Sequence, residues 1–181
     1  SRGLGDVYKR QAIVRSVFIL ALHSMEKIAV FVDVQNIYYT TRQAYGRSFN
    51  YRKFWQLLQL RGEISYAYAY AIDKKDDQQI KFQDALRHIG FEVKLKPFIQ
   101  RADGSAKGDW DVGITIDVLT LAAEVDTVVL LSGDGDFDLL LQAVYKQHGV
   151  DTVVYSVPGL TAQSLQQSCA LWRPIEADLL L

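Results

Sequence analysis

The chain has 181 residues, of which 49% are hydrophobic and 23% charged, a composition typical of one globular domain with a sizeable core. Its single cysteine, Cys169, excludes an internal disulfide and a zinc site built from several cysteines. No apolar run reaches the roughly 18 to 20 residues of a membrane span. We therefore expect a soluble domain without a membrane segment, in the reducing cytoplasm.

Charge is distributed unevenly along the chain. Residues 40–107 carry 13 Lys/Arg against 7 Asp/Glu, whereas residues 108–181 carry 2 against 11. The net charges of these two parts are therefore +6 and −9. This asymmetry is compatible with an acidic site beside a basic binding surface, and also with scattered, solvated charge.

The first 24 residues are expected to be a non-native or disordered extension outside the domain. Residues 1–11 have no usable periodicity and resemble a translated cloning or sequencing adaptor. Met25 is the only methionine and precedes the first strong strand pattern, so it is the expected natural start. A signal peptide is the alternative, because Arg15 precedes a short apolar run at 16–22. The expected domain spans residues 25–181.

Apolar patterns in the rest of the chain predict strands that alternate with helices. Strands are expected at 27–34, 64–72, 91–97, 127–131 and 150–155. Helices are expected at 36–45, 51–60, 76–89, 109–123, 138–148 and 161–168, with a polar loop at 98–108. A final short strand or helix is expected after residue 170.

This alternation indicates a parallel sheet covered by helices on both faces. We predict a single-domain α/β fold, a three-layer sandwich whose mostly parallel sheet has about five to six strands. Residues 91–97 alternate between apolar and charged side chains, which predicts an edge position for that strand.

Acidic residues follow two of the buried strands. Asp33 ends the strand 27–34, and Asp134 and Asp136 follow the strand 127–131. Asp111 lies near the start of the helix 109–123, and helix amino ends share an edge with strand carboxyl ends in such sheets. These four carboxylates are therefore expected to converge. Adjacent anions repel one another, a bound cation removes that repulsion, and carboxylate oxygens suit Mg²⁺ or Mn²⁺.

Three other acids near this edge have a structural explanation. Asp109 and Asp138 stand at predicted helix starts, where a carboxylate caps free amides and suits the helix dipole. Both are also possible additional residues of the site. Asp117 lies about 240° round the helix from Asp111, so it is expected to point elsewhere.

Three motifs carry a resemblance to a known family. Residues 32–36 are VDVQN, residues 107–112 are KGDWDV, and residues 132–137 are SGDGDF. In this order and spacing they resemble the NYN domain, most closely its LabA-like branch within the PIN-like nuclease group. The resemblance covers residues 27–172. It implies a PIN-like fold with a metal-dependent ribonuclease site.

The resemblance also implies roles for individual residues. Asp33 matches the metal ligand of the first strand, and Asn36 matches the amide that accompanies it. Asp111 matches the acid of the second motif, and Asp134 and Asp136 match those of the third. These five residues are the expected catalytic set, in which the four acids hold Mg²⁺ or Mn²⁺.

The second motif departs from the family pattern. Asp109-Trp110 stands where a single residue usually separates the glycine from the acid, so Asp109 is an alternative to Asp111 as the ligand. Lys107, or Arg101 in the loop 98–108, is a candidate contact to the scissile phosphate.

The function predicted from these features is that of a Mg²⁺- or Mn²⁺-dependent endoribonuclease. Single-stranded or structured RNA would lie across the basic middle segment. The candidate phosphate contacts are Arg42, Arg47, Arg52, Lys53, Lys74, Lys75 and Arg101. Tyr38, Tyr39 and Tyr45 are candidates either to stack on unpaired bases or to pack at the rim of the core.

Two other functions are weighed against this one. The main alternative is a catalytically weak or inactive regulator that binds RNA or protein on the same fold. A phosphatase of the haloacid dehalogenase type is disfavoured, because that class needs an Asp-x-Asp pair after its first strand, and here Val34 and Gln35 follow Asp33. A homodimer or a protein partner is compatible with the sequence, which requires neither.

Overall fold

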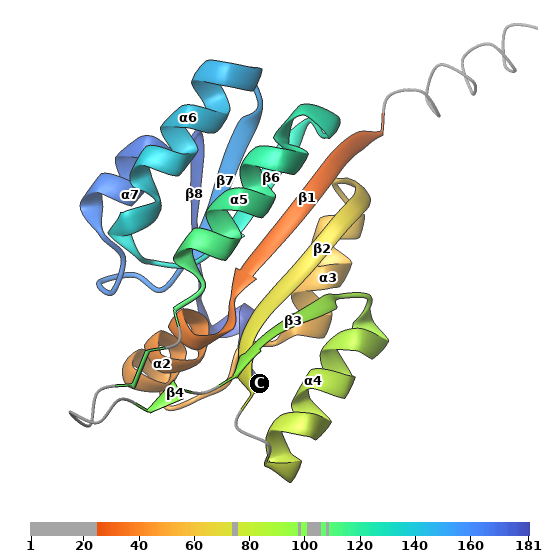
Figure 1. The fold of residues 1–181 in the computed structure, drawn as a ribbon, viewed down its shortest axis with the longest axis vertical. Helices are drawn as coiled ribbons and strands as arrows, with labels where there is room; N and C mark the ends of the chain where they lie inside the picture. The colour runs from red at the N-terminus through yellow and green to blue at the C-terminus, as the bar shows by residue number, and fades with distance from the viewer. Residues whose placement is uncertain (1–24, 74–75, 98, 101–105, 108) are drawn as a thin grey trace, which may run out of the picture.

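The computed structural model describes residues 25–73, 76–97, 99–100, 106–107 and 109–181. Within them, six α-helices and a six-stranded parallel sheet form a three-layer α/β fold, as the sequence predicts (Figure 1). The expected extension 1–24 and the side chains of Lys74, Lys75, Arg101 and Lys107 lie outside the described part of the chain.

The sheet is parallel throughout. Its strands are β1 (Glu26–Asp33), β2 (Gly62–Asp73), β3 (Glu92–Pro97), β6 (Thr127–Leu131), β7 (Asp151–Ser156) and β8 (Leu171–Pro174). They lie in the order β3-β2-β1-β6-β7-β8, and each neighbouring pair is parallel. β3 is therefore an edge strand, which confirms the expectation from its alternating side chains, whereas β1 and β6 are central.

The helices are α2 (Val34–Tyr45), α3 (Tyr51–Gln59), α4 (Asp77–Ile89), α5 (Asp111–Leu121), α6 (Asp138–His148) and α7 (Gln163–Ser168). Three short 3₁₀ turns accompany them: η1 (Ala122–Glu124), η2 (Gly135–Phe137) and η3 (Ala177–Leu179). Among the described residues, no helix is both long and apolar enough to cross a bilayer.

Several elements differ from their expected bounds by one or two residues, and two differences from the sequence-based expectation lie next to the predicted acids. α5 begins at Asp111, two residues later than predicted, and its last turn tightens into η1. Within the stretch expected to be a loop, β4 (Ile99–Gln100) and β5 (Ala106–Lys107) pair as a short antiparallel ladder. Backbone hydrogen bonds between β4 and β5 therefore order two parts of a segment whose polar composition predicted a loop.

The alternating side chains of β1 separate two hydrophobic cores. Val30 and Val32 face α3, where Phe54 and Leu58 are fully buried. Ala29 and Phe31 face the opposite side, where residues of α5, α6 and α7 cover the sheet. Figure 1 shows α3 and α4 on one side of the sheet and α5, α6 and α7 on the other. Burial of both faces accounts for the nearly unbroken apolar sequence of the central strands.

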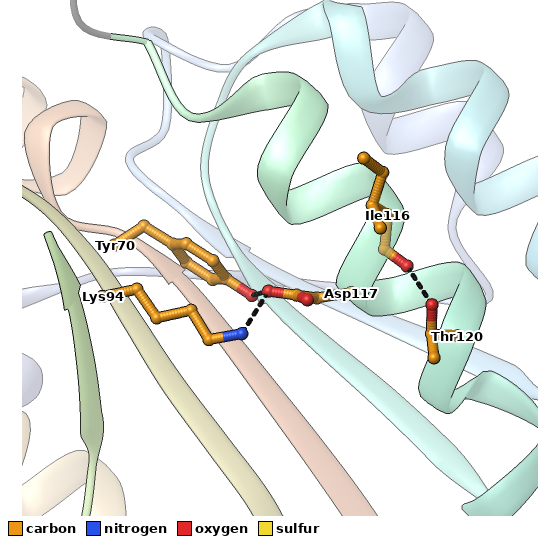
Figure 2. Close-up of polar contacts among 5 residues, drawn as sticks. All are labelled: Tyr70, Lys94, Ile116, Asp117 and Thr120. Carbon is orange, nitrogen blue, oxygen red and sulfur yellow. Dashed lines mark hydrogen bonds and ion pairs between the residues drawn. The ribbon is translucent and has the colours of Figure 1, made fainter. Parts of the chain in front are cut away.

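An ionic contact fastens α5 to the β2–β3 edge of the sheet. The ammonium of Lys94 and the hydroxyl of Tyr70 both donate to Oδ2 of Asp117, at 2.6 Å and 2.7 Å (Figure 2). The side chains of Lys94 and Asp117 are each 26% exposed, so water screens this pair only in part. Along the same helix, the Thr120 hydroxyl donates to the carbonyl of Ile116. Asp117 thus points to the sheet, away from Asp111, as its helical position predicted.

Replacing Lys94 with methionine is expected to destabilise the fold by about 1–3 kcal/mol, because Asp117 would keep its charge but lose its cation. Chemical denaturation monitored by circular dichroism measures the loss. The matched control is Lys81→Met on α4, where the lysine is exposed. Equal stability of the two variants would contradict a stabilising role for the pair.

Candidate metal centre

The parallel pairing of β1 with β6 brings two distant parts of the sequence to one edge. Val32 lies opposite Leu131 in the register of these strands. Asp33, the last residue of β1, therefore lies beside Ser132, which directly follows β6, although they are 99 positions apart in the sequence. The amino ends of α2 and α5 lie at the same end of the sheet (Figure 1).

Asp33 is held by two hydrogen bonds at the end of β1. Its Oδ1 accepts from the backbone N–H of Asn36 at 3.1 Å, which caps the amino end of α2. Its Oδ2 accepts from the Ser132 hydroxyl at 3.2 Å. Burial raises the pKa of Asp33, these hydrogen bonds oppose the rise, and the charge of Asp134 adds to it.

The loop after β6 is ordered by side chains that bond to its backbone. Asn36 accepts from the N–H of Gly133 at 2.9 Å through its side-chain oxygen. The Ser132 hydroxyl accepts from the N–H of Asp134, and the Asp134 carboxylate accepts from the N–H of Asp136. The predicted partner of Asp33, Asn36, thus positions the loop that carries two of the acids.

Gly133 is required here by a close backbone approach. A Cβ atom at this position would lie 2.6 Å from the carbonyl oxygen of Leu160. The Gly133 carbonyl also accepts from the N–H of Ala162 at 2.9 Å. Glycine therefore lets the segment before α7 pack directly against the acidic loop.

Three carboxylates meet at this edge. Asp111, Asp134 and Asp136 each offer an oxygen within 4.8 Å of the other two. Asp111 and Asp134 are partly buried, and Asp136 is exposed. Asp33 lies outside this group of three, although its charge acts on the pKa of Asp111. The structure thus brings together three of the four acids that the sequence predicted to converge, with the fourth close by.

The proximity of these acids changes the protonation of Asp111. Its pKa is raised to about 6, with burial as the largest cause and the charges of Asp109, Asp134, Asp33 and Asp136 as further causes in that order. In the described part of the chain, no Lys or Arg forms an ion pair with these five acids. The cluster therefore carries negative charge that no protein cation in that part compensates.

This donor set fits a hard divalent cation. It offers carboxylate oxygens from three side chains within reach of one ion, which are the ligands that Mg²⁺ and Mn²⁺ prefer. A bound cation would also remove the repulsion that raises the pKa of Asp111.

The additional candidates lie around the three acids. Asp109 is exposed, outside the group, and close enough for its charge to raise the pKa of Asp111. The geometry therefore favours Asp111 over Asp109 as a ligand. Asp138 lies in the first turn of α6, where its charge suits the helix dipole, and is also outside the group.

The candidate RNA contacts occupy an exposed surface of α2 and α3. The side chains of Arg42 on α2 and of Arg52 and Lys53 on α3 are exposed there. Arg47 lies in the connection between these helices, and its guanidinium donates to the carbonyls of Leu180 and Leu181. Tyr38 and Tyr39 are 52% and 56% exposed. The third tyrosine differs, because the hydroxyl of Tyr45 donates to the carbonyl of Ile175 at 2.8 Å and ties α2 to the segment after β8.

One cation near the cluster is not singled out by the sequence pattern. Lys96, at the end of β3, donates to the carbonyl of Asp109 at 3.0 Å, and its ammonium lies 4.4 Å from the centre of the Trp110 ring. The available sequence signal is its place at the carboxyl end of a predicted strand. Its contact with residues 109 and 110 depends on how α5 packs on the sheet, which that pattern does not specify.

Replacing Asp111 with asparagine is expected to stabilise the metal-free protein above about pH 6. The pKa of this carboxyl rises on folding from 3.8 to about 6, so between these values the unfolded state binds fewer protons and stability falls as pH increases. Asparagine lacks this cost. In EDTA at pH 8, the variant should melt about 2–4 °C higher than the wild type, with the difference vanishing below about pH 4. If the wild type were more stable than the variant at pH 8, the claim that the charged Asp111 carboxylate destabilises the metal-free protein would be wrong.

Comparison with known proteins agrees with this architecture. The model of the NYN domain family matches residues 27–176. The low amplitude and bright protein LabA from Synechococcus elongatus is 31% identical over 150 residues, which cover 78% of this chain and 80% of that protein. A protein of unknown function from Vibrio parahaemolyticus has a crystal structure that matches this fold with a TM-score of 0.83. Its sequence is 50% identical, and the match covers 87% of this chain and 97% of the Vibrio chain.

The family match extends over most of the chain and contains all three motifs that border the acidic cluster. The identity to LabA places the chain within one branch of that family. The chain therefore belongs to the NYN domain family, in its LabA-like branch, and has the three-layer PIN-like fold.

Proposed function

We propose that this protein is a divalent-metal-dependent ribonuclease that hydrolyses RNA phosphodiester bonds at the carboxyl edge of its sheet. The observation that carries the proposal is the group formed by Asp111, Asp134 and Asp136, whose oxygens lie within 4.8 Å of one another. The NYN family belongs to the PIN-like nucleases and supports RNA as the substrate class.

Asp111, Asp134 and Asp136 would hold Mg²⁺ or Mn²⁺, and Asp33 would add a carboxylate beside them. Such an ion, when bound, lowers the pKa of water and offsets charge on a phosphodiester in the transition state. Other residues of this chain would fix the positions of these acids. Ser132 bonds to both Asp33 and the backbone of Asp134, so it sets their relative position.

Asn36 contributes by two hydrogen bonds, one from its side chain and one from its backbone. Its side-chain oxygen holds the N–H of Gly133, while its own N–H holds Asp33. One residue therefore fixes the end of β1 relative to the loop after β6. We assign Asn36 a positioning role, because its amide oxygen is already occupied by a backbone donor.

The exposed surface of α2 is the proposed docking site for unpaired bases. The rings of Tyr38 and Tyr39 lie 5.3 Å apart in an edge-to-face arrangement, and the guanidinium of Arg42 lies 5.8 Å from the centre of the Tyr38 ring. Exposed aromatic rings beside a cation suit single-stranded nucleic acid, where bases stack and phosphates need positive charge. Arg52 and Lys53 on α3 extend the positive charge.

The test is cleavage of labelled single-stranded and hairpin RNA by the purified protein in Mn²⁺, Mg²⁺ or EDTA. We expect cutting in Mn²⁺ or Mg²⁺ and none in EDTA. Asp134→Asn keeps the shape of the side chain but removes one charge, so it should lower the rate at least about 100-fold. The matched control is Asp151→Asn, at the opposite end of the sheet, which should cut like the wild type.

The outcomes separate the proposal from its alternative. Cutting that survives both EDTA and Asp134→Asn would show that the acidic cluster is not the catalytic site. A wild type that binds RNA and metal but never cuts would favour a non-catalytic RNA-binding regulator on this fold.

A further inference from the structure

The ammonium of Lys96 contacts residues 109 and 110, which directly precede Asp111 of the acidic cluster. It donates to the carbonyl of Asp109, two residues before Asp111, and lies over the face of Trp110. A lysine has three N–H donors, and the Asp109 carbonyl uses one of them. Among the described residues, no carboxylate forms an ion pair with Lys96.

Lys94, two residues earlier on β3, provides the contrast. Both lysines project from the same face of the strand, because their register partners on β2 are Tyr70 and Ile72. The ammonium of Lys94 is paired with Asp117 at 2.6 Å and lies 4.1 Å from the centre of the Tyr68 ring. The charge of Lys94 is therefore neutralised by Asp117, whereas the charge of Lys96 is available to a ligand.

Trp110, whose ring lies beneath the Lys96 ammonium, is itself held by contacts with the sheet. Its indole N–H donates to the carbonyl of Ala71 at 2.9 Å, and its ring packs 5.2 Å from that of Tyr70. Gly113 is needed beneath the ring, since a Cβ there would lie 2.6 Å from it. The residue that anchors Lys96 is thus also the one that directly precedes Asp111 at the start of α5.

We infer that Lys96 is a phosphate-binding residue for the nucleic-acid strand that enters the acidic cluster. This inference rests on the proposed ribonuclease function and adds a subsite to it. A polyanion that approaches Asp111, Asp134 and Asp136 is repelled by them, and a fixed ammonium beside Asp109 supplies attraction at that point. Trp110 holds the ammonium in place, which lowers the entropy lost when a phosphate binds.

The test measures RNA affinity as a function of salt. A fluorescent single-stranded RNA is titrated with protein in Mg²⁺ at several salt concentrations, in the Asp134→Asn background so that the strand stays intact. Adding Lys96→Gln should weaken binding about five- to tenfold at low salt. It should also reduce the slope of log affinity against log salt by about 0.7, the value for one lost phosphate contact on a single strand.

Two variants separate charge from folding. Lys96→Arg keeps a cation on the Trp110 ring and should retain the slope of the parent protein. Lys81→Gln makes the same charge change on the exposed surface of α4 and should also leave the slope unchanged. Melting temperatures are compared for all variants. A variant that is partly unfolded would bind RNA more weakly because less of the protein is active, and not because one phosphate contact is lost.

An unchanged slope in Lys96→Gln would overturn the subsite, and so would a parent protein that does not bind RNA. The ribonuclease proposal is judged separately, by cleavage with the wild-type protein. A Lys96-dependent slope in a protein that never cuts RNA would support the subsite and overturn only the proposed chemistry.

Discussion

The candidate site depends most on the parallel pairing of β1 with β6, which brings carboxylates from distant parts of the sequence to one edge of the sheet. β1 and β6 are adjacent and in register, so Asp33 at the end of β1 lies beside the start of the loop that carries Asp134 and Asp136. α5 then adds Asp111 to the same place. Burial and neighbouring charges raise the pKa of Asp111 to about 6, so we expect this arrangement to destabilise the metal-free fold at neutral pH. Such a cost is typical of a site built for a cation.

α5 shows how the fold treats charge differently along one helix. Asp117 faces the sheet, where Lys94 and Tyr70 both bond to it, and it serves stability (Figure 2). Asp111 stands at the amino end among other acids and, within the described residues, has no basic partner. The same residue type thus has two roles that are set by the partners each position meets. The two lysines of β3 differ in the same way, because Lys94 is paired with Asp117 whereas Lys96 donates to the carbonyl of Asp109.

Much of this architecture could be predicted from the sequence, because local pattern controls it. Strand and helix periodicity predicted the parallel sheet. The rotation of an α-helix by about 100° per residue predicted that Asp117 points away from Asp111. Features set by distant contacts could not be predicted. α5 starts at Asp111 where Trp110 anchors to Ala71 on β2. Asp33 lies outside the group of three acids because the α2 cap and Ser132 hold its oxygens. Lys96 contacts residues 109 and 110 only through that packing.

The most direct test of the central claim is the anomalous diffraction of crystals grown with Mn²⁺. We expect an anomalous peak bounded by the carboxylates of Asp111, Asp134 and Asp136, and no such peak in crystals of Asp134→Asn. Crystals of the wild type with Mn²⁺ bound elsewhere, or with the three carboxylates free at saturating Mn²⁺, would contradict the assignment of this edge as a metal centre.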